Sequence, residues 1–188
     1  MASLAQQGDL AAFNVLVQRY QSLAYNVTYR ITGDADLASD ATQEALILAY
    51  RKIGQFRGGS FRAWLARIAT NCAYDQLRSR QRHRASSIED LVEEHDRVAE
   101  LVDDRVSPED AALGAELSRA IAAAVLKLPP DQRSVIVLVD FNQFNYDEAA
   151  DALGLSLGTV KSRLSRARGR VREMLLEHPE LLPAGLRP

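Results

Sequence analysis

The sequence has few of the residues that build disulfide frameworks, metal sites or membrane spans. Its 188 residues include one cysteine, Cys72, which cannot form an internal disulfide or a thiolate cage. The three histidines (His83, His95, His178) lie far apart and lack metal-ligand spacing. The longest apolar stretches, such as 135–139, fall far short of the roughly 18 to 20 residues of a membrane span, and we find no export signal. These absences predict a cytoplasmic protein with no metal, no cofactor and no direct membrane insertion.

Charged residues are numerous, but acids and bases are concentrated in different segments of the chain. The formal net charge is only −2. Residues 51–84 nevertheless carry nine bases and one acid, residues 85–116 carry eleven acids and two bases, and residues 157–172 carry six bases and no acid. Two basic blocks on either side of an acidic one predict two surfaces that bind a polyanion, joined by a spacer.

Helical periodicity runs through almost the whole chain, and no segment alternates as a strand would. Only residues 83–106 lose this periodicity, and they are strongly acidic. We therefore expect an all-α fold of two small helical domains, residues 1–82 and 107–188, joined by an acidic linker at 83–106.

Capping residues predict where the helices begin and end. Asp9 is a good N-cap for the first helix, and Gly33 can end it. A second helix is expected over about 36–53, and a third from Ser60 to about residue 80. In the second domain, Ser107 followed by a proline and two acids marks another helix start.

Residues 146–170 carry the clearest motif. A short helix capped by Asn145, a turn at Gly154 and a long helix capped by Ser156 predict a helix-turn-helix. The long helix has one apolar stripe, and its opposite face combines small residues with cations: Gly158, Lys161, Ser162, Ser165, Arg166 and Gly169. This face could simply be solvated, but six bases without an acid favour the major groove of DNA.

The second predicted helix presents a mixed face. One face of this helix carries four residues at helical spacing, Asp40, Glu44, Ile47 and Arg51, with Gln43 beside them. An isoleucine among charged residues suits a protein partner, although an ordinary charged surface with one stray apolar residue is the alternative.

The third predicted helix places Arg67, Asn71, Tyr74 and Arg78 on one face, with Trp64 at its edge. Arginine, amide and aromatic side chains together are typical of surfaces that hold single-stranded bases. The alternative reading makes Trp64 and Tyr74 core anchors. The preceding loop, 56–60, could pocket an unstacked base or be a turn that ends in a capping serine.

These stretches resemble the extracytoplasmic-function sigma factors of bacterial RNA polymerase, members of the sigma-70 superfamily. Residues 40–59 and 60–78 look like the core of sigma region 2, a bundle of three or four helices, and residues 128–168 look like region 4. The order of the segments and the acidic linker also match. The loop reads Arg-Gly-Gly-Ser, where many members have a single glycine beside a polar residue.

The resemblance implies a role for each motif. The mixed face of the second helix would dock on the clamp helices of the largest polymerase subunit, and the C-terminal domain on the flap region. Promoter residues at the minus-ten element would be Phe56, Arg57, Gly58, Ser60, Trp64, Arg67, Asn71, Tyr74 and Arg78. Those at the minus-thirty-five element would be Ser156, Thr159, Lys161, Ser162, Arg163, Ser165 and Arg166. The linker would thread into the polymerase channels, and an anti-sigma factor would cover both domains.

We therefore expect a sigma factor with no catalytic residues, which directs core polymerase to promoters and helps to melt the DNA. The alternative is a stand-alone, dimeric helix-turn-helix regulator. An enzyme acting on nucleic acid is disfavoured, because the sequence offers no paired nucleophile and base and no phosphate-cradling loop.

Overall fold

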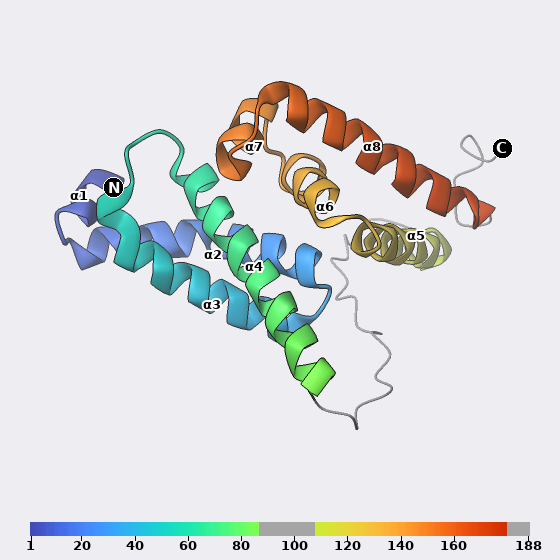
Figure 1. Ribbon diagram of the computed structural model, residues 1–188, viewed down its shortest axis with the longest axis horizontal. Helices are drawn as coiled ribbons and strands as arrows, with labels where there is room; N and C mark the ends of the chain where they lie inside the picture. The colour runs from blue at the N-terminus through green and yellow to red at the C-terminus, as the bar shows by residue number, and fades with distance from the viewer. Residues whose placement is uncertain (87–107, 180–188) are drawn as a thin grey trace.

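The computed structural model describes residues 1–86 and 108–179, with side chains for 1–83 and 114–179. These residues form helices and connecting turns without any strand, which confirms the expected all-α fold (Figure 1). The elements are α1 (Ala2–Gln6), α2 (Leu10–Thr32), α3 (Ala35–Lys52), η1 (Ile53–Gln55), α4 (Phe61–Ser86), α5 (Pro108–Leu126), α6 (Pro130–Ile136), η2 (Val137–Phe141), α7 (Tyr146–Leu153) and α8 (Leu157–Leu176). The short helix α1 was not expected from the sequence.

The expected linker begins later than predicted. Helix α4 continues through Ser86, so the first four residues of the 83–106 segment are helical. Residues 87–106, which hold most of the predicted linker, lie outside the described part of the chain.

Helices α1 to α4 form an N-terminal bundle, in which α2 and α4 start at the predicted caps, Asp9 and Ser60. The Asp9 side chain accepts a hydrogen bond from the Ala12 amide at 3.0 Å, and α2 ends at Gly33 with a φ of 70°. Thr28 and Thr42 join α2 to α3 through a buried 2.8 Å hydrogen bond between their hydroxyls. Small buried residues let the helices approach closely (Ala24, Ala38, Ala41, Ala45, Ala49, Ala66, Ala69, Ala73).

Helices α5 to α8 form a C-terminal bundle that contains the predicted helix-turn-helix. Asn145 and Glu148 make the complete capping box at the start of α7, and Gly154 ends that helix with a φ of 65°. Ser156 caps α8 by accepting a hydrogen bond from the Thr159 amide at 3.2 Å. The π-helical η2 joins α6 to the turn before α7.

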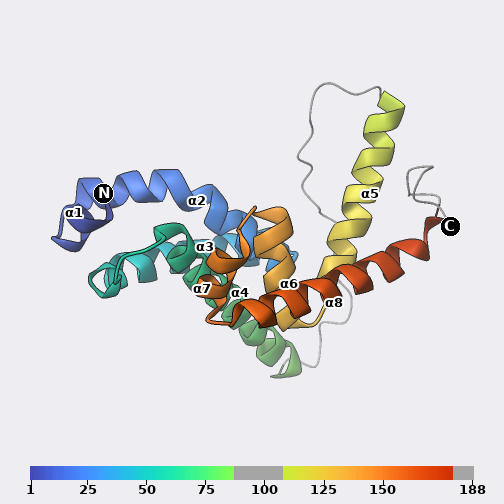
Figure 2. The ribbon, with the colours of Figure 1, turned by 90° about the horizontal axis from the view of Figure 1, so that it is seen from above.

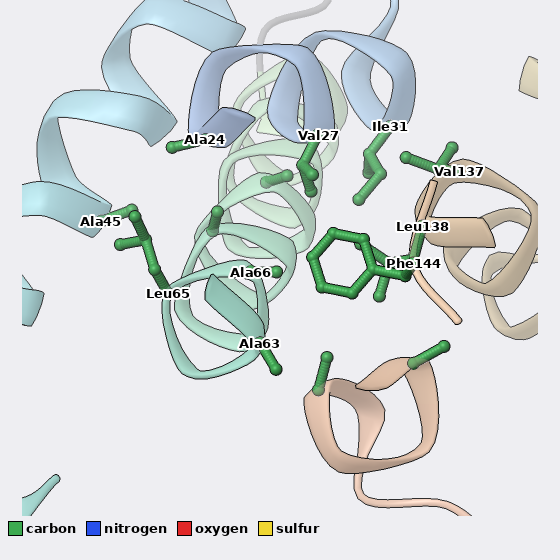
Figure 3. Close-up of a cluster of buried hydrophobic side chains, with 14 of the residues drawn as sticks. Ala24, Val27, Ile31, Ala45, Ala63, Leu65, Ala66, Val137, Leu138 and Phe144 are labelled. Carbon is green, nitrogen blue, oxygen red and sulfur yellow. The ribbon is translucent and has the colours of Figure 1, made fainter. Parts of the chain in front are cut away.

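The two bundles pack directly on each other and share one hydrophobic core. Ile31 of α2 and Ala66 of α4 meet Leu138 and Phe144 of the C-terminal bundle (Figure 3). All four side chains are buried, Phe144 to 3% exposure. Each bundle therefore covers apolar side chains of the other.

Helix α8 starts beside α7 and passes the base of α5, and the two helices then diverge as α5 projects away from the N-terminal bundle (Figure 2). An apolar cleft of about 490 Å³ lies between them, lined by residues such as Ile121, Phe141, Val171 and Leu175. Among the described helices, none combines the length and hydropathy that a bilayer-crossing segment needs.

Candidate nucleic-acid interface

The exposed face of α8 is the basic surface that the sequence predicts. Its buried stripe (Val160, Leu164, Ala167, Val171) packs on the rest of the C-terminal bundle. Lys161, Ser162, Ser165 and Arg166 lie exposed on other faces of the helix, and Ser156 is exposed at its cap. Thr159 is half-buried, and its hydroxyl lies 2.8 Å from that of Ser156. The helix therefore offers cations, hydroxyls and its N-terminal amides to solvent.

Two of the six cations on α8 are held by acids of the same bundle. Arg168 donates two hydrogen bonds to Asp140, at 2.9 and 2.6 Å, and this carboxylate raises the pKa of the guanidinium. Arg163 lies 3.3 Å from Asp131 and is half-buried. These pairs fix α8 against α6 and η2, whereas Lys161 and Arg166 remain on the exposed face.

The predicted mixed face of α3 is exposed as a whole. Asp40, Gln43, Glu44, Ile47 and Arg51 all lie at the surface, and the Ile47 side chain is 44% exposed. In Figure 1, α3 lies on the opposite side of α4 from α7 and α8. An isoleucine left in water between charged neighbours is typical of a surface that another protein covers.

The loop before α4 combines exposed backbone with a buried aromatic anchor. Gly58 has a φ of 88° with open space around it, and Arg57 and Ser60 are exposed. The ring of Phe56 is only 8% exposed, because it packs against Phe61 and Trp64 at centroid distances of 5.8 and 5.4 Å. In this conformation the Phe56 ring has no free face for a base. Trp64 is half-buried at the edge of the same cluster.

The predicted promoter face of α4 is divided in two. Asn71 and Arg78 are exposed, and Arg78 forms a surface pair with Asp75. Arg67, which is also exposed, and Tyr74, which is half-buried, bond to the C-terminal bundle. The Tyr74 hydroxyl donates to the Pro130 carbonyl at 2.8 Å and accepts from the Ser134 hydroxyl at 3.0 Å. Burial raises the pKa of Tyr74, which keeps its phenol protonated and able to donate.

Arg67 caps the end of the first helix of the helix-turn-helix. Its Nε donates to the Ala152 carbonyl at 3.0 Å, and its Nη2 donates to the Asp151 carbonyl. The last carbonyls of a helix lack intrahelical partners and carry partial negative charge, so a cation there is favourable. A side chain at Gly154 would lie 3.3 Å from the same Nη2 atom, so the guanidinium fits beside the glycine turn.

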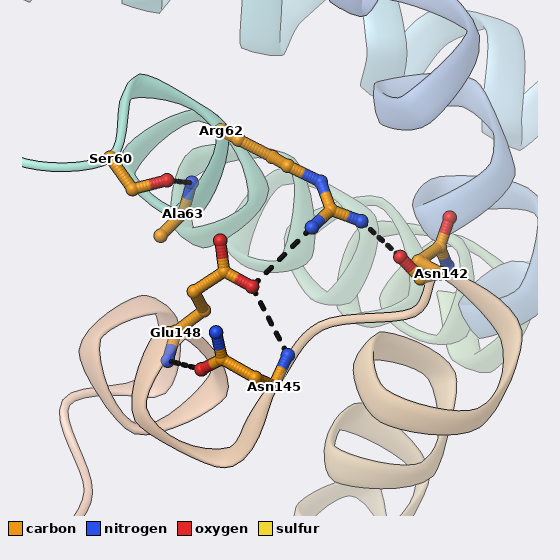
Figure 4. Close-up of polar contacts among 6 residues, drawn as sticks. All are labelled: Ser60, Arg62, Ala63, Asn142, Asn145 and Glu148. Carbon is orange, nitrogen blue, oxygen red and sulfur yellow. Dashed lines mark hydrogen bonds and ion pairs between the residues drawn. The ribbon is translucent and has the colours of Figure 1, made fainter.

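Arg62 makes a contact between the two bundles that the sequence did not predict. Its guanidinium donates to the Asn142 carbonyl, lies 3.4 Å from the Glu148 carboxylate and sits 3.9 Å from the centre of the Phe144 ring (Figure 4). One side chain of α4 thus meets three residues of the segment that leads into α7. In the sequence, Arg62 is one base in a basic block, and no local signal separates it from its neighbours.

Arg133 makes the reciprocal contact from the C-terminal bundle. Its Nη1 donates to the Ile31 carbonyl at 2.8 Å, in the last turn of α2, and its Nη2 donates to the Leu126 and Leu128 carbonyls. Burial among these groups lowers the pKa of the guanidinium. Each bundle therefore supplies an arginine that caps a helix C-terminus of the other, and the sequence shows neither pairing.

Comparison with known proteins places both bundles in one family. Residues 16–83 match the sigma-70 region 2 model, and residues 118–171 match the model of sigma-70 region 4. The chain is 37% identical to the ECF RNA polymerase sigma factor SigE of Mycolicibacterium smegmatis over 92% of its own length and 65% of the relative's. It is also 37% identical to the ECF sigma factor SigW of Bacillus subtilis, over 90% of its own length and 92% of the relative's.

A solved structure agrees with these matches. The sigma factor RpoE of Bartonella quintana, in complex with the anti-sigma factor NepR, superposes with a TM-score of 0.69 at 29% identity, over 88% of this chain and 98% of that one. This match includes both bundles, so it supports a sigma factor over a stand-alone regulator. The chain belongs to the extracytoplasmic-function sigma factors, which are transcription initiation factors and not enzymes.

Proposed function

We propose that this sigma factor docks on core RNA polymerase through the outer face of α3 and reads two promoter elements with its two bundles. The docking face comprises Asp40, Gln43, Glu44, Ile47 and Arg51 and would meet the clamp helices of the largest subunit. The exposed Ile47 side chain carries this proposal. It is a large apolar group left at the surface among the charges of that face.

The basic face of α8 would read the minus-thirty-five element. Lys161 is exposed near the capped N-terminus of the helix and Arg166 is exposed further along it, a geometry that suits base edges and phosphates of the major groove. Arg163 would contribute less than the sequence indicates, because Asp131 already pairs with it. The C-terminal bundle would also contact the flap region of the polymerase.

The loop at 56–60 and the face of α4 would contact the minus-ten element and hold an unpaired base. Arg57, Gly58, Asn71 and Arg78 are exposed for this purpose. Phe56 would support the loop from beneath, because its ring is packed against other aromatic residues. The protein would act in the cytoplasm. Its two domains would span residues 1–82 and 107–188 and would be joined by a linker at 83–106.

An anti-sigma factor is a further proposed partner. The support is the matched sigma factor, whose structure holds the anti-sigma factor NepR. Two weak promoter contacts held on one polymerase would gain from effective concentration, so the isolated chain should bind promoter DNA poorly.

Substitution of Ile47 by aspartate tests the docking face. We expect Ile47→Asp to lower co-purification with core polymerase at least tenfold, because it buries a charge at the centre of an interface. Val15→Asp is the matched control, since Val15 is similarly exposed, at 43%, on α2. Equal polymerase binding by both variants and the native chain would place the docking face elsewhere.

A further inference from the structure

A hydrogen bond from the N-terminal helix reaches the loop at 56–60, which we call the minus-ten loop. The Gln6 side-chain amide donates to the Phe56 carbonyl at 2.5 Å, across 50 positions in sequence. Helix α1 packs on η1, the turn that leads into this loop, and lies at the same end of the bundle (Figure 1). The proposed function gives the loop a role at the minus-ten element but gives α1 none.

Helix α1 is itself anchored, although the Gln6 side chain is exposed. The neighbouring Ala5 is 4% exposed and belongs to the hydrophobic core. Gly8 has a φ of 91° and reverses the chain, and its amide donates to the Ala5 carbonyl at 3.1 Å. Because the backbone of α1 is fixed in this way, Gln6 reaches the Phe56 carbonyl from a defined position.

The minus-ten loop is a short arc between two fixed ends. At one end, the Phe56 ring packs in the aromatic cluster, and the Phe56 amide donates to the Ile53 carbonyl at 3.0 Å. At the other end, the Ser60 hydroxyl accepts a hydrogen bond from the Ala63 amide at 3.2 Å (Figure 4). The two glycines between these ends have φ values of 88° and 82°, with open space where a Cβ would lie. The fixed ends, and not packing of the arc itself, therefore hold the loop in place.

The Gln6 hydrogen bond fixes the orientation of the first peptide group of this arc. The Phe56 carbonyl and the Arg57 amide belong to one planar, trans peptide, so the N–H points away from the C=O. Among the residues that the structure describes, no acceptor takes a hydrogen bond from this amide. By holding the carbonyl, Gln6 directs a free backbone donor to the side of the peptide opposite α1.

We propose that Gln6 is a positioning residue of the minus-ten site, which holds the loop in the conformation that receives an unpaired base. This inference rests on the proposed function, because it takes the minus-ten loop as the segment that holds the base. Gln6 acts through the Phe56 carbonyl and does not touch the DNA. The Arg57 amide is the donor that it presents, and a backbone N–H suits base edges and phosphate oxygens alike.

Amide hydrogen exchange in the full chain tests whether Gln6 holds the loop. Gln6→Glu keeps the length and shape of the side chain but removes the N–H donor, because an ionised carboxylate only accepts hydrogen bonds. We expect the Phe56 amide to exchange about fivefold faster in this variant, and the Ala63 amide at the other end of the loop to exchange at the native rate.

Gln7→Glu is the matched control, since Gln7 is exposed next to Gln6 and the substitution introduces the same charge. It should leave the exchange of the Phe56 amide unchanged. Gln6→Lys carries N–H donors on a side chain of similar length and should restore the native exchange rate.

Promoter melting by the reconstituted holoenzyme tests what the held loop does. The probe is a promoter duplex that the native holoenzyme selects from a library of randomised sequence, and permanganate marks its unpaired thymines. We expect this reactivity to appear about fivefold more slowly with Gln6→Glu than with Gln7→Glu, while both variants co-purify equally with core polymerase. Gln6→Ala, which introduces no charge, should show a similar loss relative to Gln7→Ala.

The two measurements separate this inference from the proposed function. Native exchange of the Phe56 amide in Gln6→Glu would overturn the positioning role, and so would a failure of Gln6→Lys to restore the native rate. If exchange is faster in Gln6→Glu but melting is equal in Gln6→Glu and Gln7→Glu, then Gln6 holds the loop, and the proposed role of that loop at the minus-ten element is wrong.

Discussion

Helices α4 and α8 carry similar cationic faces but differ in what those cations touch. On α8, Lys161 and Arg166 are exposed to solvent, and the helix is held by ion pairs at other positions. On α4, Arg62 and Arg67 donate to carbonyls of the opposite bundle. An arginine-rich face is therefore not by itself a free DNA surface. Helix C-termini present negative partial charge as phosphates do, so the same side chain suits both.

The largest expected effect concerns the core that the two bundles share. Leu138→Ala removes a fully buried side chain of the C-terminal bundle and should lower the free energy of unfolding by about 2 to 5 kcal/mol. Urea unfolding followed by Trp64 fluorescence reports on the N-terminal bundle, and circular dichroism reports on the whole chain. We expect both transitions to shift together.

The exposed Leu4 provides the control, since Leu4→Ala should change stability by no more than about 0.5 kcal/mol. A Trp64 transition that Leu138→Ala leaves unmoved would show that the bundles unfold separately and that their contact is weak.

The next effect concerns the exposed face of α8. Lys161→Ala or Arg166→Ala should each lower promoter-directed transcription. Each lost base contact should weaken the binding free energy for the promoter by about 1 to 3 kcal/mol. Polymerase co-purification should be unaffected. Arg19→Ala on α2 removes the same charge from a distant helix and serves as the control. Transcription that is unchanged in either α8 variant would place the reading face elsewhere.

A smaller effect is expected from the helix cap beside Arg62. Asn145→Ala removes the hydrogen bond from the Glu148 amide, 2.8 Å long, and should cost about 1 kcal/mol of stability. Asp9→Ala removes the equivalent cap of α2, far from the contact between the bundles. Both variants should be destabilised to a similar degree. Only Asn145→Ala should also speed amide hydrogen exchange in α4 next to Arg62. Identical exchange rates in the two variants would show that the Asn145 cap does not support the contact of Arg62 with the C-terminal bundle.

The smallest effect concerns the paired cations of α8. Asp140→Asn removes the negative charge that pairs with Arg168 and one of its two acceptor oxygens, and it should steepen the salt dependence of DNA binding by about one ion. The slope of log affinity against log salt measures this effect. Asp131→Asn releases Arg163 from a single, longer contact of 3.3 Å and should change the slope less. Unchanged slopes in both would mean that neither arginine reaches the DNA.

Much of the local structure could be predicted from the sequence, because caps and periodicity act within a few residues. The caps at Asp9, Asn145 and Ser156 and the turn glycines at 33 and 154 are all found as expected. The outward direction of Ile47 follows from helical spacing alone. The roles proposed for these faces remain predictions.

The contact between the bundles could not be predicted in the same way. Arg133 binds the Ile31 carbonyl across 102 positions in sequence, and Arg67 binds the Ala152 carbonyl across 85. Backbone carbonyls are present at every residue, so the sequence contains no sign of which one an arginine will meet. The aromatic residues show the same limit, since Phe56, which the resemblance assigns to promoter contact, is buried against Phe61 and Trp64.

Gly154 shows how two requirements can meet in one residue. It adopts a positive φ that lets α7 turn into α8, and it also leaves space for the Arg67 guanidinium. An alanine at this position would distort the helix-turn-helix and press on the arginine at once. A substitution at Gly154 should therefore damage two features in a single step, the turn between α7 and α8 and the contact of Arg67 with the end of α7.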